Sequence, residues 1–388
     1  MVKKISKVGI VAMGNISVGG GYPRVIYDLI KVLNEIGKEV YLLTPFKLDY
    51  KKIEQLYGPI KLKKVYYPSK IKSFFCREDV LRRKFMKREF KKMAGEVDFI
   101  FDICGRIMDK YLPKDFARKN YVVWGIASYH KSESLNFNNF RRNLKEGIKN
   151  YFKSKKFYPE KDIKIYALDQ WTRNQLIEKC NLKPEEMCLY PAIQVKELKY
   201  DKKRKKNQIT INGRIDPLKR IEDGIELFAI GTKNNPEYNL VIIGGTSPES
   251  REYIRNLNKL ISKLKISKRV EIITNPSFEK IKEELLNSKI LIDTQRESNL
   301  TMTTIEAMAA GNLVLSYKKG NNYKEILGSG KFGHGFDTIE EGGSVLKRVL
   351  REYTCKNNQG IIKGSIKRAE SFSRENFVKR IKSILASE

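Results

Sequence analysis

Short apolar runs and longer amphipathic segments alternate along the first half of the chain. Residues 22–37 carry apolar side chains at helical spacing and end at Gly37, which predicts an amphipathic helix, and a second helix is expected around 170–180. The apolar runs are rich in β-branched and aromatic residues and predict strands. These runs lie at 7–13, 38–44, 98–103, 121–127 and 164–169.

The same alternation restarts in the second half. Its apolar runs, at 208–212, 239–245, 270–274, 289–294 and 312–317, are short and rich in β-branched residues, as is typical of parallel strands buried on both faces. Amphipathic segments fall near 221–234, 249–265, 278–287, 304–310 and, at the end of the chain, 373–386. Strands alternating with helices predict a doubly wound α/β domain in each half.

The chain has 388 residues, which is longer than a domain with a single hydrophobic core usually is, so two domains are expected. Residues 196–207 are charged, have little to bury and predict a linker. We therefore expect an N-terminal Rossmann-like domain at 1–195, a C-terminal one at 208–370, and a final helix within 371–388 that packs back on the first domain. Two such domains imply a central cleft, where ligands bind at the carboxyl ends of the strands.

Composition narrows the class of protein. Hydrophobic residues make up 41% and charged residues 31%, which is globular, and no 18-residue apolar run predicts a transmembrane helix. The five cysteines are scattered and form no CxxC, which indicates reduced thiols in a cytoplasm and neither a zinc site nor a disulfide framework. With two histidines and no Asp-rich motif, we expect no metal site.

The net charge of +32 is the strongest global signal. Such a field favours a polyanionic partner, namely an anionic membrane, nucleic acid or a phosphorylated substrate, although a lysine-rich surface also serves solubility. Residues 70–95 mix cations with Phe74, Phe75, Phe85, Met86 and Phe90. This segment suits the interface of an anionic bilayer, and it equally suits a helix that packs its apolar face on the first domain.

Two loops at predicted strand ends could hold an anion. "NGRIDPLKR" (212–220) follows the strand at 208–212 and presents Arg214 and Lys219, a planar fork and a point charge that fit a diphosphate. "GNISVGGGYPR" (14–24) opens a helix, and its glycines, including Gly20 and Gly21, allow close approach of a ligand. Each could also be an ordinary solvated loop.

The third feature is "ESNLTMTTIEAMAAG" (297–311), where carboxylates and hydroxyls precede an apolar helix. One interpretation is a capping box in which Thr303 caps the helix and Glu306 reaches back to it. The other is a helix N-terminus that holds an anionic ligand. These three features come from both domains and follow the order that a two-domain cleft requires.

Together these segments resemble the glycogen-synthase-like GT-B glycosyltransferases, the retaining E-x7-E group of the family-four type. "GGGYPRVIYDLIKVLNEIGKEVYLLTP", "YALDQWTRNQLIEKCNLKPEEMCLYPAIQV", "INGRIDPLKRIEDGIELF" and "ESNLTMTTIEAMAAGNLVLSY" match in order and spacing and span most of the chain. The resemblance implies a GT-B fold with two Rossmann-like domains facing a cleft. It also implies a hexosyltransferase that uses a nucleotide-diphosphate sugar, UDP- or GDP-linked, and a lipid-linked, glycolipid or glycan acceptor.

The resemblance assigns roles to individual residues. Arg214 and Lys219 would hold the donor diphosphate, Glu306 would bind the ribose, and Gly20 and Gly21 would admit the diphosphate from the other lobe. The segment from Ile273 to Pro276 would flank the base, and His130 either contacts the sugar or acceptor side or is an ordinary loop histidine, whereas His334 is expected in a surface turn. The residues expected to line the phosphates, or the base in the case of Thr274, are Thr301, Met302, Thr303, Thr304 and Thr274.

The sequence departs from the family motif at one place. Eight residues, not seven, separate Glu297 from Glu306. Either Ser298 replaces the first glutamate, or a one-residue bulge lets Glu297 reach the sugar.

The predicted mechanism follows from the charge that leaves with the diphosphate. Arg214, Lys219 and the helix start at 303–306 are suited to stabilise it, so we predict metal-independent, retaining transfer without a cofactor. The expected partners are a nucleotide sugar and an anionic membrane surface. The protein is expected in the cytoplasm, bound peripherally to the inner face of that membrane. The alternative is a nucleic-acid binder or a DNA-modifying glycosyltransferase that uses the same basic surface.

Overall fold

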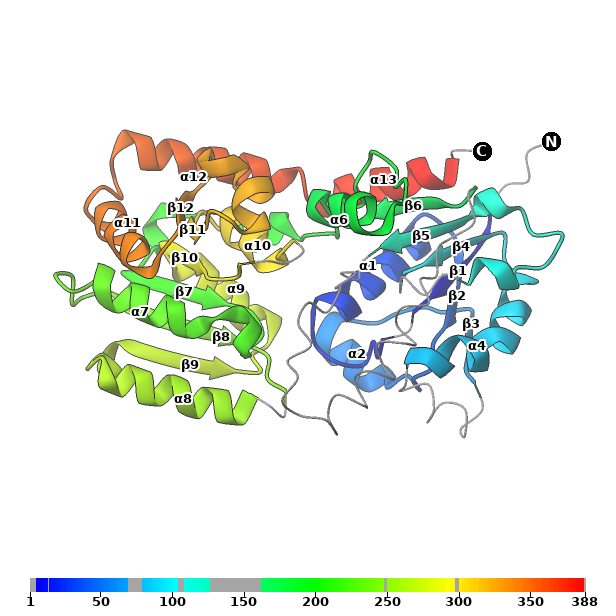
Figure 1. Cartoon of the computed structure of the whole chain (residues 1–388), viewed down its shortest axis with the longest axis horizontal. Helices are drawn as coiled ribbons and strands as arrows, with labels where there is room; N and C mark the ends of the chain where they lie inside the picture. The colour runs from blue at the N-terminus through cyan, green and yellow to red at the C-terminus, as the bar shows by residue number, and fades with distance from the viewer. Residues whose placement is uncertain are drawn as a thin grey trace. The chain divides into compact units, whose positions relative to one another are not determined.

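The computed structural model describes residues 5–12, 14–68, 79–103, 108–125, 162–247, 250–296 and 300–386, with the backbone alone at 79–84 and 179. The chain divides into two compact units, which are described separately. Unit 1 comprises Met1–Tyr190 with Arg380–Glu388, and unit 2 comprises Pro191–Lys379 (Figure 1).

Unit 1 is built on a six-stranded sheet in the order β3-β2-β1-β4-β5-β6. All its neighbouring strands are parallel, and the central strand β1 sets Ile10 beside Leu42 on one side and Phe101 on the other. The strands are β1 (Lys7–Val11), β2 (Glu39–Leu43), β3 (Lys64–Tyr66), β4 (Phe99–Asp102), β5 (Tyr121–Gly125) and β6 (Lys164–Ala167). Its α-helices include α1 (Gly21–Glu35), α2 (Tyr50–Tyr57), α4 (Asp79–Ala94) and α6 (Gln170–Cys180).

Unit 2 repeats this architecture with a parallel sheet in the order β12-β11-β10-β7-β8-β9. The strands are β7 (Gln208–Asn212), β8 (Asn239–Gly244), β9 (Val270–Thr274), β10 (Ile290–Asp293), β11 (Leu313–Tyr317) and β12 (His334–Phe336). The α-helices are α7 (Ile221–Gly231), α8 (Ser250–Lys263), α9 (Phe278–Asn287), α10 (Met302–Ala309), α11 (Ile339–Arg351), α12 (Lys356–Glu370) and α13 (Arg374–Ala386), whose last turns belong to unit 1.

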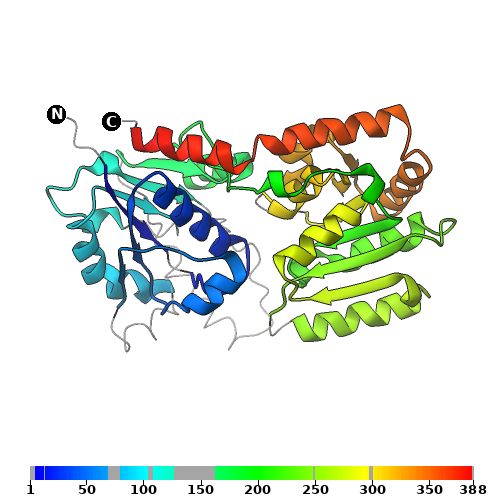
Figure 2. The same cartoon turned by 180° about the vertical axis from the view of Figure 1, so that it is seen from behind.

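Helices cover both faces of the unit 2 sheet. Helices α8 and α11 lie beside α7, whereas α9 and α12 lie beside α10, and the two groups come to the front in opposite views (Figures 1 and 2). The strands bury β-branched side chains between these layers, such as Ile209, Ile242 and Ile292. This is the doubly wound arrangement that the hydrophobic pattern predicts, and each predicted strand is present with its ends shifted by at most a few residues.

The pattern did not predict the two short edge strands, β3 and β12, or the helices α2, α11 and α12. Each edge strand has only three residues, which is too few for a recognisable period. The surface turn expected at His334 is wrong. His334 is instead the half-buried first residue of β12 and pairs with Leu315 of β11.

The charged segment 196–207 differs from the expected linker because it packs within unit 2. The ammonium group of Lys205 is buried and donates hydrogen bonds to the carbonyl oxygens of Leu285 (3.2 Å) and Ser288 (2.6 Å) and to Asn312 Oδ1 (2.7 Å). Burial lowers the pKa of Lys205 to about 7. These bonds join the segment to α9 and to the start of β11, so it is a structural part of the unit.

Helix α4 decides between the two interpretations of the basic segment as far as it is described. Met86, Phe90 and Met93 are fully buried in the core of unit 1, which also contains Tyr121 of β5. The exposed side chains between them are the cations Lys87, Arg88, Lys91 and Lys92. The apolar face of α4 therefore packs on the sheet and is not available to a bilayer. Phe74 and Phe75 lie outside the described residues. In the part of the chain that the structure describes, no helix is long and apolar enough to cross a membrane.

Candidate functional site

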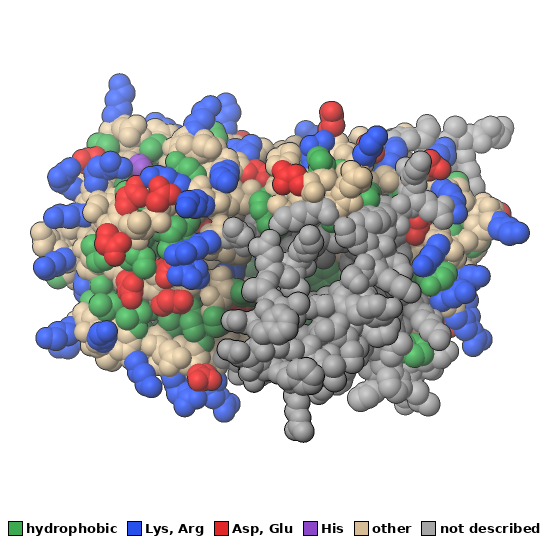
Figure 3. All heavy atoms as spheres, in the orientation of Figure 1, with side chains coloured by type: hydrophobic (Ala, Val, Ile, Leu, Met, Phe, Trp, Pro, Cys, Tyr) green, Lys and Arg blue, Asp and Glu red, His purple; other side chains and the backbone are tan. Residues whose placement is uncertain are grey.

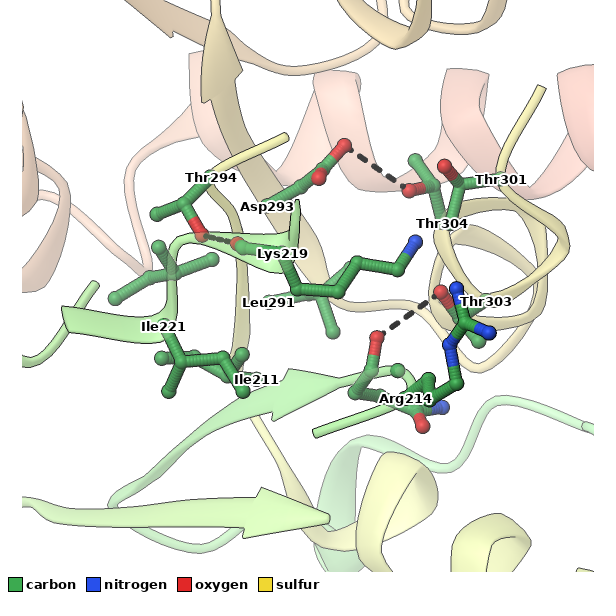
Figure 4. Close-up of a pocket in the computed structure, with 13 residues that line it drawn as sticks. Ile211, Arg214, Lys219, Ile221, Leu291, Asp293, Thr294, Thr301, Thr303 and Thr304 are labelled. Atoms are coloured by element: carbon green, nitrogen blue, oxygen red, sulfur yellow. Dashed lines mark hydrogen bonds between the residues drawn. The ribbon is translucent and has the colours of Figure 1, made fainter. Parts of the chain in front are cut away.

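A small hollow lies at the carboxyl ends of β7 and β10 in unit 2, beside the start of α10 (Figure 4). Parallel strands end at one edge of a sheet, which is why Asn212 of β7 and Asp293 of β10 meet there. The hollow has a volume of about 10 Å³, room for about one water molecule. Its polar lining comprises Asn212, Gly213, Arg214, Lys219, Asp293, Thr294, Thr301, Thr303 and Thr304.

The loop after β7 supplies the two predicted cations. Two backbone hydrogen bonds fasten it to the end of β8, from Gly213 N to Ile243 O (3.1 Å) and from Ile215 N to Gly245 O (2.9 Å). The Arg214 guanidinium forms an ion pair with Asp216, and 61% of the Arg214 side chain is exposed. Arg214 is thus oriented at the rim of the hollow while much of its fork faces solvent.

Lys219, near the other end of the same loop, also lines the hollow. Its carbonyl accepts a hydrogen bond from Thr294 Oγ1 (2.6 Å), its ammonium donates to Gln295 Oε1, and Figure 4 shows the ammonium pointing toward the start of α10. Burial lowers the pKa of Lys219, an effect that the nearby Asp293 and Asp216 oppose and that Arg214 reinforces. A buried cation with a depressed pKa in a polar hollow is characteristic of an anion-binding or catalytic position.

Asp293 belongs to the site although it is not among the predicted residues. Its Oδ2 accepts hydrogen bonds from Thr304 Oγ1 (3.3 Å), from Ser316 Oγ (3.3 Å) and from the amide of Asn322. This buried carboxylate thereby joins β10 to α10 and β11 and holds negative charge beneath Lys219. The signal was visible, because "ILID" ends an apolar strand with an acid at the edge where ligands bind.

Of the two interpretations of 297–311, the capping box at Thr303 is wrong. The N-cap is Thr301, and Thr303 lies inside the first turn, where its hydroxyl donates to the carbonyl of Asn212 (3.1 Å). Asn322 holds the cap residue instead, accepting from Thr301 N (3.1 Å) and donating to Thr301 Oγ1 (2.9 Å). The threonines thus tie the helix start to β7 and to the segment after β11. Glu306 is buried one turn further on and does not line the hollow.

A second network holds the loops on either side of the hollow. Buried Asp223 of α7 accepts two hydrogen bonds from the Arg220 guanidinium (2.6 and 2.9 Å) and one from Tyr317 Oη (2.8 Å). Arg296 lies 3.7 Å from the same carboxylate. Arg220 directly follows Lys219 and adopts a left-handed backbone with φ 49°. Asp223 therefore fixes the end of the cation loop to the segment that leads into Glu297.

The remaining predicted residues are placed elsewhere or lie outside the described residues. Gly20, at φ 141°, is the N-cap of α1 in unit 1 and Gly21 is its first residue. Thr274 is exposed at the end of β9 and does not line the hollow. His130, Glu297 and Ser298 are not among the described residues. Within the described ranges, no three His, Cys, Asp or Glu are grouped as metal ligands.

Part of the chain matches a known family model, and its fold matches those of solved glycosyltransferase structures. Residues 194–341 match the family model of the glycosyl transferases group 1, a range that holds the cation loop and α10. The fold of the chain is that of the Anabaena protein Alr3699/HepE, solved with UDP and glucose, with a TM-score of 0.71, 14% identity and coverage of 99% of this chain and 100% of the other. It is also that of WaaG, a glycosyltransferase involved in lipopolysaccharide biosynthesis, with a TM-score of 0.67, 14% identity and coverage of 98% and 100%.

The chain has the GT-B fold, and residues 194–341 carry a glycosyl transferases group 1 domain. This confirms the predicted fold, and the domain supports the predicted class of enzyme, a glycosyltransferase. A curated relative of the chain is the Xenopus laevis protein named GDP-Man:Man(3)GlcNAc(2)-PP-Dol alpha-1,2-mannosyltransferase, which is 24% identical over 174 residues. That match covers 42% of this chain and only 35% of the relative. Retention of configuration and the E-x7-E assignment stay predictions.

Proposed function

We propose that this glycosyltransferase transfers a hexosyl group from a nucleoside-diphosphate sugar, whose diphosphate binds at the hollow in unit 2. The observation that carries the proposal is the convergence of Arg214 and buried Lys219 on one hollow at the start of α10. A guanidinium fork, an ammonium and a helix N-terminus are three groups that favour a diphosphate. Because the hollow has room for about one water molecule, we place the diphosphate at its mouth, between Arg214 and Thr303.

The chemistry of these residues suits departure of the diphosphate. Cleavage of the anomeric C–O bond leaves negative charge on the β-phosphate, and Lys219 and Arg214 are positioned to stabilise it in the transition state. The charged form of Lys219 is disfavoured by burial, and a bound phosphate would favour it. Asn212 adds a donor, because its buried Nδ2 has no hydrogen-bond partner. These groups are fixed before the donor arrives, which is the basis of electrostatic preorganisation.

The finer assignments belong to the same proposal. Glu306 would bind the ribose, Gly20 and Gly21 would bind the diphosphate, and the region of Thr274 would flank the base, as the family resemblance implies. Transfer would be retaining and would need no metal, since Arg214 and Lys219 provide the positive charge. The named relatives differ in nucleotide, because the Anabaena protein was solved with UDP and the Xenopus enzyme is named for GDP-mannose.

Replacing Arg214 by alanine is expected to weaken donor binding about tenfold or more, because a charge-assisted fork to the diphosphate is lost. A panel of UDP- and GDP-sugars is measured by thermal shift on wild type and variant. At a donor concentration 100 times Kd, the wild type gains about 2.7 kcal/mol of stability, and the variant gains distinctly less at the same concentration. Arg255→Ala, an exposed arginine of α8 that does not line the hollow, is the matched control. If no nucleotide sugar raises the melting temperature of the wild type, the donor proposal is wrong.

We further propose that the acceptor is lipid-linked and is met at an anionic membrane surface. The Xenopus relative is named for a diphosphodolichol-linked acceptor and WaaG for lipopolysaccharide synthesis, which supports this class. The net charge of +32 supplies the attraction, and on the face in Figure 3 Lys and Arg side chains are spread widely, with Asp and Glu among them. Because the apolar side chains of α4 at 86, 90 and 93 are buried, contact through α4 would be electrostatic and would not insert into the bilayer.

Electrostatic docking predicts co-flotation with anionic liposomes at low salt and its loss near 0.5 M salt, where screening shortens the range of the field. Glutamine at the four exposed cations of α4 (Lys87, Arg88, Lys91 and Lys92) is expected to reduce flotation about tenfold, at about 1 kcal/mol or less per residue. The control removes the same charge from unit 2, at Arg255, Lys259, Lys263 and Lys268, and is expected to change flotation far less. Salt-sensitive binding to duplex DNA without flotation would favour the nucleic-acid alternative.

A further inference from the structure

Unit 2 has a second hollow, separate from the first hollow at Arg214 and Lys219, which is called the donor hollow below because the donor diphosphate is proposed to bind there. Its lining comes from the loop before β12, the last turns of α11 and the first turns of α12, and comprises Gly330, Lys331, His334, Arg348, Val349, Glu352, Asn357, Asn358 and Ile361. Helix α11 follows the carboxyl end of β12 and runs back along the sheet, so its last turns lie toward the amino ends of the strands. The donor hollow lies at the carboxyl ends. The two hollows share no residue.

The second hollow has the size of a small-molecule site. Its volume of about 550 Å³ falls within the roughly 300–1,000 Å³ of ligand pockets. A bare phosphate would leave most of it empty, since one water molecule occupies about 30 Å³ of liquid. Most of its lining side chains are polar or charged, so a hydroxyl-rich ligand suits it better than an apolar one.

Two cations dominate its charge. Arg348 and Lys331 are both exposed, and neither forms an ion pair with any described residue, although the Lys331 ammonium lies 5.5 Å from the centre of the Phe332 ring. The carboxylate in the lining, Glu352, is engaged by Arg351 at 2.7 Å. The net positive charge of the hollow is therefore uncompensated, and an anion would find both a fork and a point charge there.

His334 and the start of α12 complete the polar wall. His334 Nε2 lies 3.1 Å from Asn358 Oδ1, which fixes the ring, and Asn358 Nδ2 donates to Glu352 O (2.8 Å). The first turn of α12, which includes Asn357, carries no acidic side chain, so its N–H groups add to the positive potential. The side chains of His334 and Asn358 are thus held in place by bonds within the wall.

We propose that this hollow is a second ligand site, which binds a small phosphorylated polyol of the hexose-phosphate class. Arg348 and Lys331 would take the phosphate, and Asn357 and the Glu352 carboxylate would meet the hydroxyl groups. Binding there is separate from sugar transfer and does not rest on the proposed donor or acceptor.

The test is titration calorimetry of the full chain with glucose 6-phosphate and, separately, with inorganic phosphate and glucose. Glucose 6-phosphate is expected to bind with 1:1 stoichiometry and more tightly than either fragment. Arg348→Gln and Lys331→Gln are each expected to weaken it about tenfold. Lys347→Gln removes a neighbouring exposed cation of α11 that does not line the hollow, and is expected to leave the affinity within about twofold. Melting temperatures without ligand confirm that each variant is folded.

His334 gives a second measurement that does not depend on calorimetry. The chain has two histidines, so in His130→Gln the remaining imidazole resonances belong to His334. Burial lowers the pKa of His334, helped by Arg348 and opposed by Asn358 and Glu352. A phosphate bound beside Arg348 and Lys331 is expected to raise that pKa, and to do so less in Arg348→Gln.

Several results would overturn the inference. It fails if no hexose phosphate binds, if Lys347→Gln weakens binding as much as Arg348→Gln, or if the His334 resonances do not respond. It also fails if Arg214→Ala abolishes binding, because the ligand would then occupy the donor site. Inorganic phosphate that binds as tightly as the sugar phosphate would overturn the assignment to a polyol.

Discussion

Replacing Lys219 by methionine is expected to lower kcat/KM about 10²- to 10³-fold and to leave the folded protein at least as stable as the wild type. The loss of activity follows from removing one preorganised donor aimed at the charge that develops on the diphosphate. Stability is spared because methionine keeps the apolar stem and removes an ammonium that burial disfavours. Gln295 loses one donor but keeps its contact with Thr301 Oγ1 (3.3 Å).

The pH dependence of stability gives this prediction a definite sign. Because the pKa of Lys219 is lowered in the fold from the ordinary 10.5, the unfolded chain binds this proton more tightly than the folded protein does. The contribution of Lys219 to the free energy of unfolding therefore rises with pH between its lowered pKa and about 10.5, and is constant below that interval. Urea unfolding at several pH values should show a smaller rise in Lys219→Met than in wild type.

Lys233→Met provides the control, because Lys233 is an exposed lysine after α7 that is absent from the lining of the hollow. It is expected to change neither turnover nor the pH dependence of unfolding appreciably. A Lys219→Met protein that transfers sugar at the wild-type rate would contradict the role given to this ammonium. Loss of stability in parallel with activity would instead indicate that Lys219 is structural.

The fold was predictable where the chain repeats a clear physical pattern. All residues of Leu313–Tyr317, and all of Asn239–Gly244 after Asn239, are buried, as expected for strands of a parallel sheet that is covered on both faces. The edge strands β3 and β12 have three residues each, which is too short for such a run to be recognised in the sequence. Lys205 shows a further limit, because a lysine among charged neighbours gives no sign that backbone carbonyls far along the chain will surround its ammonium.

The candidate site was predictable in its local part. Arg214 and Lys219 lie on one loop directly after a strand, so spacing and the strand-end rule suffice to bring them to one edge of the sheet. Three further residues of the site were not predicted, namely Asp293, Asn212 and Gln295. They reach the site through contacts between elements, which depend on the order of strands in the sheet, and spacing along the chain does not reveal that order. The N-cap of α10 was misassigned because Thr301 and Thr303 are equally good caps in the sequence. Asn322, after the next strand, bonds Thr301 in the structure.

The loop that carries Arg214 and Lys219 packs closely against Gly244, where there is no side chain. We therefore expect Gly244→Ala to destabilise the protein strongly. A Cβ at this position would lie 1.7 Å from the carbonyl oxygen of Gly213 and 3.4 Å from Arg214 N. The obstructing atom is backbone, so no rotamer change relieves the contact and the loop must move away from β8. Overpacking of this kind costs about 1–3 kcal/mol, and we expect the upper part of that range because the bonds from Gly213 and Ile215 to β8 are strained together.

Gly245→Ala is a control separated from the test by one residue. Nothing lies within 4 Å of a Cβ built at Gly245, which is exposed, so the same change in chain entropy is made without the clash. Thermal unfolding should show a clear fall for Gly244→Ala and almost none for Gly245→Ala. The donor-induced thermal shift should also be lost in the first variant and kept in the second, because displacing Gly213 moves Arg214 from the rim of the hollow. Equal behaviour of the two variants would mean that the approach of Gly213 to Gly244 does not position the cations.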